Sequence, residues 1–361
     1  MMLRNLALTA VAATLTFTTT LGATARNPTT CNEKSFIVFG DSASDTGNKK
    51  AIFNSQELSF YWKGRYSNGP VWNEYTAYLL GMPLVNYAIG GATSSNSALV
   101  NGTENGQLIP SFLDQINHYL QNTTSASTGK SLVEHPERSI VTLEIGGNNF
   151  MQPMLTDPNY LFTNKDRLIE GLVKDIMAGL QTTYNAGYRR FVIWDAFPLY
   201  YAPAISGNPQ LVSLFKQIGA ETNVKLAKAV NDFRIKYKSG SVLLFNSANM
   251  FQLIHDPRVI SAINVTDTTS ACFSGANSGE NAGICSNSEQ YLYYDPIHGA
   301  LRTHFIIGAA VARFITNPDK GLTVNDLVEA AQKYRVGQAT AEKNILAAAG
   351  IHNGPQYPSR N

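Results

Sequence analysis

The chain has 361 residues, of which 44% are hydrophobic and 15% are charged, and its formal net charge at pH 7 is +2. This composition argues against wholesale disorder and provides enough apolar residues for a sizeable core. Because the net charge is small and the sequence contains no run of lysine or arginine, we do not expect a nucleic-acid partner. A neutral or weakly charged small molecule is the more natural substrate. The sequence does not indicate an oligomeric state.

Residues 1–25 have the pattern of a secretory signal peptide. Arg4 precedes an apolar stretch from Leu6 to Leu21, and Ala23-Thr24-Ala25 matches a small-residue cleavage site. The apolar stretch is short and rich in threonine for a membrane anchor, and no later stretch is long enough to span a bilayer. We therefore expect a secreted, extracellular protein without an integral membrane span, in which residues 26–361 form one domain.

Five short apolar runs predict strands, and longer stretches between them predict helices. The predicted strands are Phe36–Phe39, Leu84–Tyr87, Ile140–Ile145, Phe191–Trp194 and Val242–Phe245. The predicted helices are Val71–Leu80, Ile109–Leu120, Lys165–Ala186, Leu211–Lys238 and Leu301–Thr316. Pro110 fits the first turn of the second helix, and Gly187 fits the end of the third. This alternation implies a parallel sheet with helices on both faces, and residues 319–361 read as appended helices with a ragged tail.

Cysteines and glycosylation motifs agree with an oxidising compartment. Cys272 and Cys285 could close the Gly/Ser/Asn-rich loop between them, which leaves Cys31 free or paired in a way the sequence does not show. The motifs at Asn101, Asn122 and Asn264 would be glycosylation sites in a eukaryotic host, although such triplets also occur by chance. No Cys or His cluster has metal-ligand spacing, so we expect neither a metal nor another cofactor.

A candidate nucleophile, Ser42, follows the first predicted strand. A serine just past the carboxyl end of a parallel strand lies where open α/β sheets bind ligands, but it needs a base to become reactive. Asp295 and His298 lie three residues apart, so the carboxylate can fold back onto the imidazole Nδ1 and leave Nε2 facing a hydroxyl. Each motif alone is more often an ordinary turn that caps a helix. Together they predict a nucleophile, a base and an orienting carboxylate.

Candidate oxyanion donors follow the second and third predicted strands. Gly90-Gly91 ends the run that begins at Asn86, and Gly146-Gly147-Asn148 ends the third run. Glycine lets backbone N–H groups approach a ligand, and an asparagine amide is a common donor to a developing oxyanion. A glycine pair alone is usually only a tight turn. The combination with the serine and the Asp-x-x-His element is difficult to attribute to chance.

In these four motifs the sequence resembles the GDSL (SGNH) lipases and esterases, in their secreted plant, fungal and haemolysin-like branch. The resemblance covers about residues 36–316, and Gly64–Trp72 matches a segment that this branch shares. It implies the SGNH hydrolase fold, a flavodoxin-like three-layer α/β/α sandwich with a five-stranded parallel sheet. It also implies a Ser-His-Asp triad, Ser42, His298 and Asp295, that hydrolyses carboxylic esters through an acyl-enzyme.

The resemblance further implies an oxyanion hole made by the backbone N–H groups of Ser42 and Gly91 and the side chain of Asn148. The sequence departs from the family pattern at three positions. Ala43 replaces a leucine and should affect packing only, Asn149 stands where aspartate is usual and is expected to loosen the loop, and Gly299 replaces a frequent proline. None of these changes removes a catalytic group.

Substrate choice is less defined. Candidate pocket residues are Tyr61, Trp62, Arg65, Trp72 and Phe150. The alternative is core packing for the four aromatic residues and an exposed structural ion pair for the arginine. Lipid, short-chain and acetylated-carbohydrate esters all remain open as substrates. A phospholipid acyltransferase or phospholipase using the same site, and a secreted binding protein without turnover, are the alternative functions.

Overall fold

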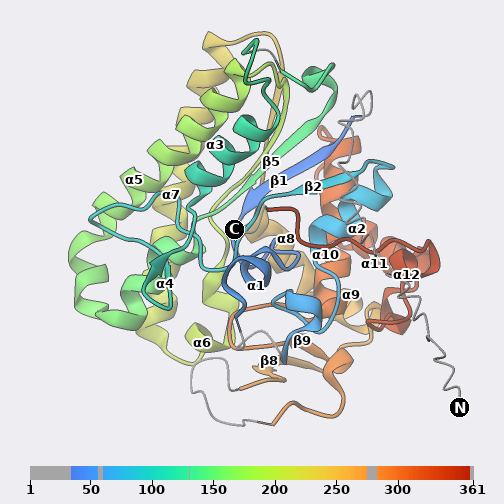
Figure 1. The fold of residues 1–361 in the computed structure, drawn as a ribbon. Coiled ribbons are helices and arrows are strands. Elements are labelled where there is room, and N and C mark those ends of the chain that lie inside the picture. Colours follow the sequence, from blue (N-terminus) through green and yellow to red (C-terminus); the bar gives the residue numbers. More distant parts are fainter. Residues whose placement is uncertain (1–33, 56–59, 130, 275–282, 358–361) are drawn as a thin grey trace, which may run out of the picture.

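The computed structural model describes residues 34–55, 60–129, 131–274 and 283–357, and a five-stranded parallel sheet lies at its centre (Figure 1). The strands are β1 Phe36–Gly40, β2 Leu84–Asn86, β5 Ile140–Glu144, β6 Arg190–Trp194 and β7 Ser241–Phe245. Their order across the sheet is β2-β1-β5-β6-β7, and every neighbouring pair is parallel. The five predicted strands are therefore confirmed, to within one residue at each end.

Helices cover both faces of this sheet. One layer contains α3 Phe112–Asn122, α4 Gly147–Thr156, α5 Pro158–Asn185 and α7 Pro209–Lys236. The other contains α2 Trp72–Leu79, α8 Ser247–Ile254, α9 Pro257–Ala262, α10 Leu301–Thr316 and α11 Val324–Lys333. In Figure 1 the layer with α3, α5 and α7 lies to the left of the sheet, and α2, α10 and α11 lie to its right. The expected three-layer α/β/α sandwich, the SGNH hydrolase fold, is confirmed.

Shorter elements complete the described chain. These are the helices α1 Asn48–Phe53, α6 Pro203–Ser206 and α12 Ile345–Ala348, and the strands β3 Thr103–Glu104, β4 Gln107–Leu108, β8 Asp267–Ala271 and β9 Tyr291–Tyr293. β3 pairs with β4, and β8 pairs with β9. In Figure 1 the β8–β9 pair lies below the central sheet, and β9 leads directly into the loop that carries Asp295 and His298.

Successive side chains of a strand enter two different cores. In β1, Ile37 and Phe39 pack with the helices of the first layer, whereas Phe36 and Val38 pack with those of the second. Adjacent side chains of a strand point to opposite faces of the sheet, so a strand covered on both faces needs a continuous apolar run. This requirement explains why the central strands could be predicted from the sequence.

Two predicted helix signals have different outcomes. α3 begins after Ser111, whose hydroxyl accepts the Asp114 N–H while the Asp114 carboxylate accepts the Ser111 N–H. Because this reciprocal cap starts the helix, Pro110 precedes it, and the prediction that Pro110 lies in the first turn is wrong. Gly187 follows Ala186, the C-cap of α5, and has a φ of +100°, as the prediction of a glycine stop requires.

The last described residues bind the edge of the sheet. The Gln356 side chain accepts the Asn86 N–H at 2.6 Å and donates to the Leu84 carbonyl at 2.9 Å, so it occupies the place of a further strand beside β2. Asn48 accepts the N–H groups of Gln356 and Tyr357. Figure 1 shows this segment crossing the molecule from α12 towards α1. The expected helices after residue 319 exist, but the expectation of a ragged tail is wrong for residues 350–357.

Several other predictions concern covalent features and surface. Cys272 and Cys285 form a disulfide, as expected, whereas Cys31 and the predicted signal peptide lie outside the described residues. Asn101, Asn122 and Asn264 are exposed, and their glycosylation stays a prediction.

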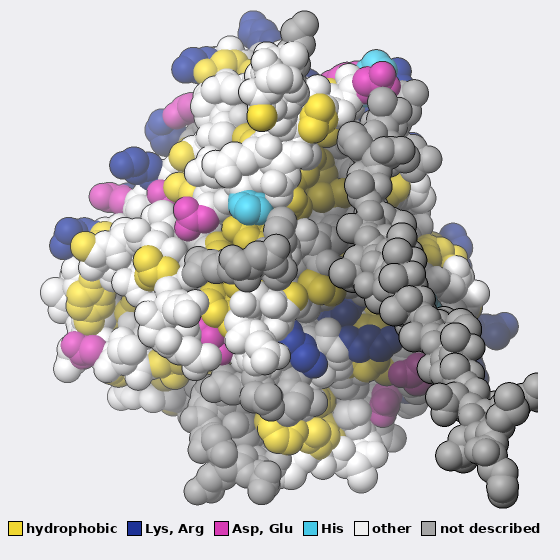
Figure 2. Space-filling view, viewed as in Figure 1, with side chains coloured by type: hydrophobic (Ala, Val, Ile, Leu, Met, Phe, Trp, Pro, Cys, Tyr) yellow, Lys and Arg dark blue, Asp and Glu magenta, His cyan; other side chains and the backbone are white. Residues whose placement is uncertain are grey.

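None of the helices in the described ranges is long and apolar enough to cross a membrane. Figure 2 shows acidic and basic side chains interspersed on the face of Figure 1.

Candidate active site

The end of β1 and the loop before α10 bring three polar side chains together. Ser42 lies two residues beyond β1, and its Oγ is 2.7 Å from Nε2 of His298. Nδ1 of the same ring is 2.7 Å from Oδ2 of Asp295. Ser42 and His298 are 256 residues apart in sequence. The structure thus places the predicted carboxylate on one ring nitrogen and the predicted hydroxyl on the other.

The Asp295 carboxylate is buried but well supplied with donors. Its Oδ1 accepts the N–H groups of Ile297 and His298, both at 2.7 Å. Its Oδ2 accepts the Tyr61 hydroxyl at 2.7 Å in addition to the contact with the imidazole. Burial on its own would raise the pKa of Asp295, but the nearby His298 and these hydrogen bonds outweigh it, and the net shift is downward. The group is therefore suited to remain ionised beside a protonated imidazole.

The predicted oxyanion donors lie at the ends of β1, β2 and β5. Nδ2 of Asn148 donates to the Ala92 carbonyl at 3.0 Å, which fixes the amide and leaves its second proton for a ligand. Gly91, next to Ala92, has a φ of +82°. The backbone N–H groups of Ser42 and Gly91 find no acceptor among the described residues. These three donors are available for a developing negative charge.

Asp45 joins the serine loop to the glycine loop. Its buried carboxylate accepts the backbone N–H groups of residues 47–49, at the start of α1, and that of Gly90 at 2.8 Å. Burial raises the pKa of Asp45, and the four N–H groups partly offset that effect. By holding Gly90, this carboxylate sets the position of Gly91. The sequence alone did not single out Asp45 as a residue that supports the candidate site.

Asn149 supports the same loops. Its Oδ1 accepts the Ser94 N–H at 3.0 Å, and its Nδ2 donates to Ser94 Oγ at 2.8 Å. The Ser94 hydroxyl in turn donates to Asp175 at 2.7 Å. Because the hydroxyl proton is given to Asp175, the Ser94 oxygen needs a donor at position 149, and an amide supplies it. The expectation that Asn149 loosens the loop is wrong.

A mostly apolar cavity of about 80 Å³ opens beside the candidate nucleophile. Ser42, Asn148 and His298 line it. Its apolar walls include Trp72, Met151, Phe197, Leu199, Phe251 and Ile297. Such a mainly apolar site with a few convergent polar groups is typical of a small-molecule pocket.

Two further buried carboxyl groups, those of Asp41 and Glu144, line this cavity. Burial raises the pKa of Asp41 to about 6. Burial also raises the pKa of Glu144 well above its usual value, and the neighbouring Asp41 raises it further. Ser44 donates its hydroxyl to Glu144 at 2.6 Å. Glu144 therefore keeps its proton over a wider pH range than an exposed glutamate does.

Comparison with known proteins establishes the family. The model of the GDSL-like lipase/acylhydrolase family matches residues 36–281. The chain belongs to this family. This match confirms the resemblance to GDSL lipases and esterases that the sequence motifs indicated, and it places the chain among the lipases and acylhydrolases.

Individual relatives of this GDSL protein are distant. A thermolabile hemolysin of Vibrio parahaemolyticus is 25% identical over 74% of this chain and 60% of its own length. An Arabidopsis thaliana protein named inactive GDSL esterase/lipase-like protein 25 is 24% identical over 76% of this chain and 70% of its own. Acetylajmalan esterase 2 of Rauvolfia serpentina is 23% identical over 76% of this chain and 88% of its own length. Because one of these names includes the word inactive, activity has to be argued from the residues of this chain.

Of the five predicted substrate-contacting residues in this GDSL protein, the structure brings only Trp72 to the cavity. Tyr61 is turned towards Asp295 instead, through the hydrogen bond from its hydroxyl. Phe150 is 3% exposed and packs in the core of the first helix layer. The alternative of core packing therefore describes Phe150.

Arg65 and Trp62 also stay away from the cavity. The Arg65 guanidinium is buried and donates two hydrogen bonds to Glu74, at 3.1 and 2.9 Å, and one each to the Lys63 and Asn353 carbonyls, at 3.1 and 2.7 Å. Its donors are therefore committed within the protein rather than to a substrate anion. The ion pair weighed as an alternative for Arg65 exists, but it is buried rather than exposed. Arg65 lies 4.9 Å from the centre of the Trp62 ring, so the two side chains pack on each other.

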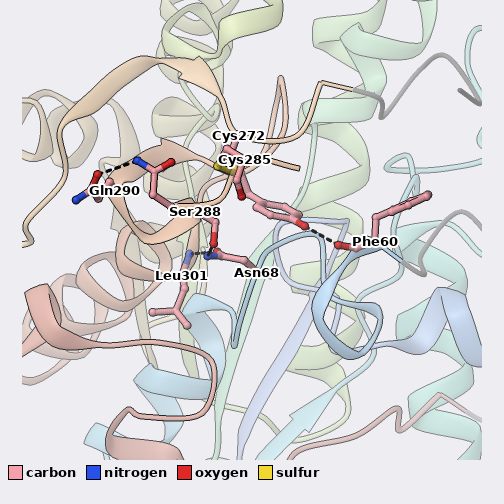
Figure 3. Close-up of a disulfide and its surroundings, with 9 residues drawn as sticks. Phe60, Asn68, Cys272, Cys285, Ser288, Gln290 and Leu301 are labelled. Carbon is pink, nitrogen blue, oxygen red and sulfur yellow. Dashed lines mark hydrogen bonds between the residues drawn. A yellow bond between two sulfur atoms is a disulfide. The ribbon is translucent and has the colours of Figure 1, made fainter. Parts of the chain in front are cut away.

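Two residues that the sequence analysis did not single out hold the histidine loop. Oδ1 of Asn68 accepts the Leu301 N–H at the start of α10 at 2.7 Å, and its Nδ2 donates to the Ser288 hydroxyl at 3.1 Å (Figure 3). The Ser67 hydroxyl donates to the Gly299 carbonyl at 3.1 Å. Both residues belong to the Gly64–Trp72 segment, so the motif was visible in the sequence, but not what it contacts.

Proposed function

We propose that this GDSL protein is a secreted serine carboxylic-ester hydrolase that works through an acyl-enzyme. The observation that carries the proposal is the chain of hydrogen bonds from Asp295 through His298 to Ser42, at a cavity with free N–H donors. Each link lies at 2.7 Å, within the range for a nucleophile and its base.

In the first stage His298 takes the proton of Ser42 as Oγ attacks the ester carbonyl carbon. Asp295 stabilises the imidazolium that forms. The oxyanion accepts hydrogen bonds from the backbone N–H groups of Ser42 and Gly91 and from the Asn148 amide. Collapse of this intermediate breaks the ester C–O bond, and the imidazolium gives its proton to the leaving alkoxide. The acyl group is then bonded to Ser42.

In the second stage water replaces the alcohol. His298, again neutral, takes a proton from water as the oxygen attacks the acyl carbon, and the same donors hold the second oxyanion. Collapse releases the carboxylic acid and returns the proton to Ser42. Both stages require the neutral imidazole, so activity is expected to fall at acidic pH.

The cavity favours a short acyl group. Its volume of about 80 Å³ is small beside the roughly 300–1,000 Å³ of pockets that bind larger ligands. Trp72 and Ile297 supply apolar contact for such a chain. Acetyl and other short-chain esters are therefore the substrates we propose, and a long fatty acyl chain would extend beyond the cavity. The name of the Rauvolfia relative, an esterase of an acetyl compound, fits this proposal.

Secretion is part of the proposal. It is supported by the signal-peptide pattern of residues 1–25 and by the Cys272–Cys285 disulfide, since disulfides persist mainly in oxidising compartments.

The test is hydrolysis of p-nitrophenyl acetate, butyrate, octanoate and palmitate by the wild type and by Ser42→Ala. We expect the wild type to prefer the short esters and the variant to lose about 10³-fold or more in kcat. Ser127→Ala, which changes an exposed serine, is the matched control and should retain wild-type rates.

Equal activity of the wild type and Ser42→Ala would exclude Ser42 as the nucleophile. If neither protein hydrolysed any ester, acetylated sugars and phospholipids included, the proposal would fail and a binding protein without turnover would take its place.

A further inference from the structure

Asp295 has a side-chain partner besides the catalytic imidazole. The Tyr61 hydroxyl donates to Oδ2 of Asp295 at 2.7 Å, and the same oxygen faces Nδ1 of His298. Tyr61 comes from a segment more than two hundred residues earlier in the chain and is 8% exposed. Burial raises the pKa of Tyr61 far above its usual value, and the adjacent carboxylate raises it further. The hydroxyl therefore remains a donor at any pH at which the protein would work.

The Tyr61 ring is held by a cluster of aromatic side chains. Ring centres of Tyr66, Tyr294 and Phe273 lie 5.2, 5.6 and 5.8 Å from that of Tyr61, and the Phe273 ring stands at 90° to it. Such edge-to-face packing is favourable and fixes the direction of a ring. Tyr66 also lies 4.9 Å from the His298 ring. The cluster therefore contacts both residues that activate the candidate nucleophile.

The disulfide anchors this cluster to the catalytic loop. Phe273 directly follows Cys272, and its N–H donates to the carbonyl of Tyr294, the residue before Asp295, at 2.7 Å. The Tyr294 hydroxyl donates to the Phe60 carbonyl at 2.5 Å, which ties the loop to the segment carrying Tyr61. Figure 3 shows the Cys272–Cys285 disulfide and, across from it, the dashed hydrogen bond that the Phe60 carbonyl accepts.

We propose that Tyr61 is a positioning residue for ester hydrolysis: its hydroxyl holds the Asp295 carboxylate against His298 and disperses part of its charge. The disulfide maintains this arrangement through Phe273. The inference rests on the function proposed above, because it assigns Tyr61 a role in that reaction. It replaces the role in substrate contact that the sequence suggested for Tyr61.

Removal of the Tyr61 hydroxyl should shift the pH dependence of ester hydrolysis in one direction. Without this donor more negative charge remains on Asp295, and the protonated imidazole is more stable. The acid limb of kcat/KM then moves to higher pH. The titratable groups around His298 are Asp295 and Tyr294 of its own loop, Tyr61 and Tyr66, Asp41 at the end of β1 and His304 of α10. A Tyr61→Phe substitution removes only one hydroxyl from this set.

The experiment compares the pH profiles of kcat and kcat/KM for the wild type, Tyr61→Phe and Tyr188→Phe. Tyr188→Phe is the matched control, because it removes a buried tyrosine hydroxyl that lies outside this cluster and bonds the Tyr119 hydroxyl at 2.7 Å. For Tyr61→Phe we expect the acid limb to move up by roughly half a pH unit and kcat to fall about tenfold, with KM little changed. Tyr188→Phe should lower the Tm similarly and leave the acid limb in place.

A second arm tests the disulfide. The Cys272→Ser/Cys285→Ser double variant should move the acid limb in the same direction as Tyr61→Phe, by a smaller amount. If that variant does not fold, the two phenylalanine variants still decide the question.

An unshifted acid limb in Tyr61→Phe, or an equal shift in both phenylalanine variants, would overturn the inference. Ser42→Ala is assayed alongside. Absence of Ser42-dependent hydrolysis in the wild type would refute the proposed function itself, whereas normal hydrolysis with an unshifted Tyr61→Phe would refute only the role of Tyr61.

Discussion

Two carboxyl groups near the candidate nucleophile, those of Asp295 and Glu144, are similarly buried but favour opposite protonation states. Asp295 is 1% exposed and Glu144 is 4% exposed. Asp295 accepts two backbone N–H groups and a tyrosine hydroxyl and faces His298, and its pKa is lowered. Glu144 accepts the Ser44 hydroxyl and faces Asp41, and its pKa is raised.

Burial alone therefore does not fix the charge of a carboxyl group in this site. Desolvation opposes ionisation in both cases, and the donors and charges around each group decide the outcome. Substitution of the carboxyl by an amide should therefore have very different consequences at the two positions.

The largest expected effect is that of Asp295→Asn. The amide cannot stabilise the imidazolium, and its N–H₂ group favours the wrong imidazole tautomer, so kcat should fall about 10⁴-fold with KM little changed. Initial rates on a short-chain p-nitrophenyl ester measure this effect. A loss smaller than tenfold would mean that Asp295 is not needed as a charged partner of His298.

A smaller effect is expected at Asn149. In Asn149→Asp the Ser94 oxygen loses its donor and a second carboxylate comes close to Asp175, so the free energy of unfolding should fall by about 1–3 kcal/mol. Adding Asp175→Asn exchanges the amide and the carboxylate and should restore most of the loss. Urea unfolding of the two single variants and the double variant measures the coupling. Strictly additive losses would contradict the network.

The buried histidine His304 should make the free energy of unfolding depend on pH. His304 is 3% exposed, and burial lowers its pKa from 6.5 to about 3. Between these values the unfolded chain binds a proton that the folded protein does not, so the free energy of unfolding falls as the pH is lowered through this window.

Compared with wild type, His304→Gln should therefore lose about 2–3 kcal/mol less on acidification from neutral pH to about pH 4.5. Parallel losses in the two proteins would show that His304 is protonated in the folded state. Chemical unfolding at several pH values distinguishes the two cases.

The smallest effect is expected for Glu144→Gln. A protonated carboxyl and an amide have the same shape, and the amide oxygen can still accept from Ser44, so kcat/KM should stay within about threefold of wild type. The activity of Glu144→Gln should then exceed that of Asp295→Asn by several orders of magnitude. A loss of a hundredfold or more in Glu144→Gln would show that this group acts in the reaction as a charged residue.

Much of the fold and the outline of the candidate site could be predicted from the sequence, for a physical reason. Strands buried on both faces must be continuously apolar, and loops at their carboxyl ends must be polar or glycine-rich, so β1 and Ser42 were both visible. The contact between Asp295 and His298 could also be predicted, because the two residues lie only three positions apart in the sequence. The start of α5 at Pro158, after the Asp157 cap, had a readable signal that the prediction from Lys165 did not use.

Contacts between distant polar residues could not be predicted in the same way. Nothing local distinguishes Gln356 as the partner of the β2 edge, or the Tyr61 hydroxyl as the partner of Asp295 rather than of a substrate. The identity of such a partner depends on where two separate segments come to lie. For the same reason the sequence did not show that Glu74 lies beside Arg65 and binds its guanidinium.

Labelling with a fluorophosphonate at neutral pH, followed by peptide mapping by mass spectrometry, tests directly whether Ser42 is an activated nucleophile. Such a reagent phosphonylates a serine whose oxygen is activated by a neighbouring base. We expect one adduct, on Ser42, formed by the wild type and lost in His298→Ala. An adduct on another serine, or an active protein that leaves Ser42 unlabelled, would contradict this role of Ser42.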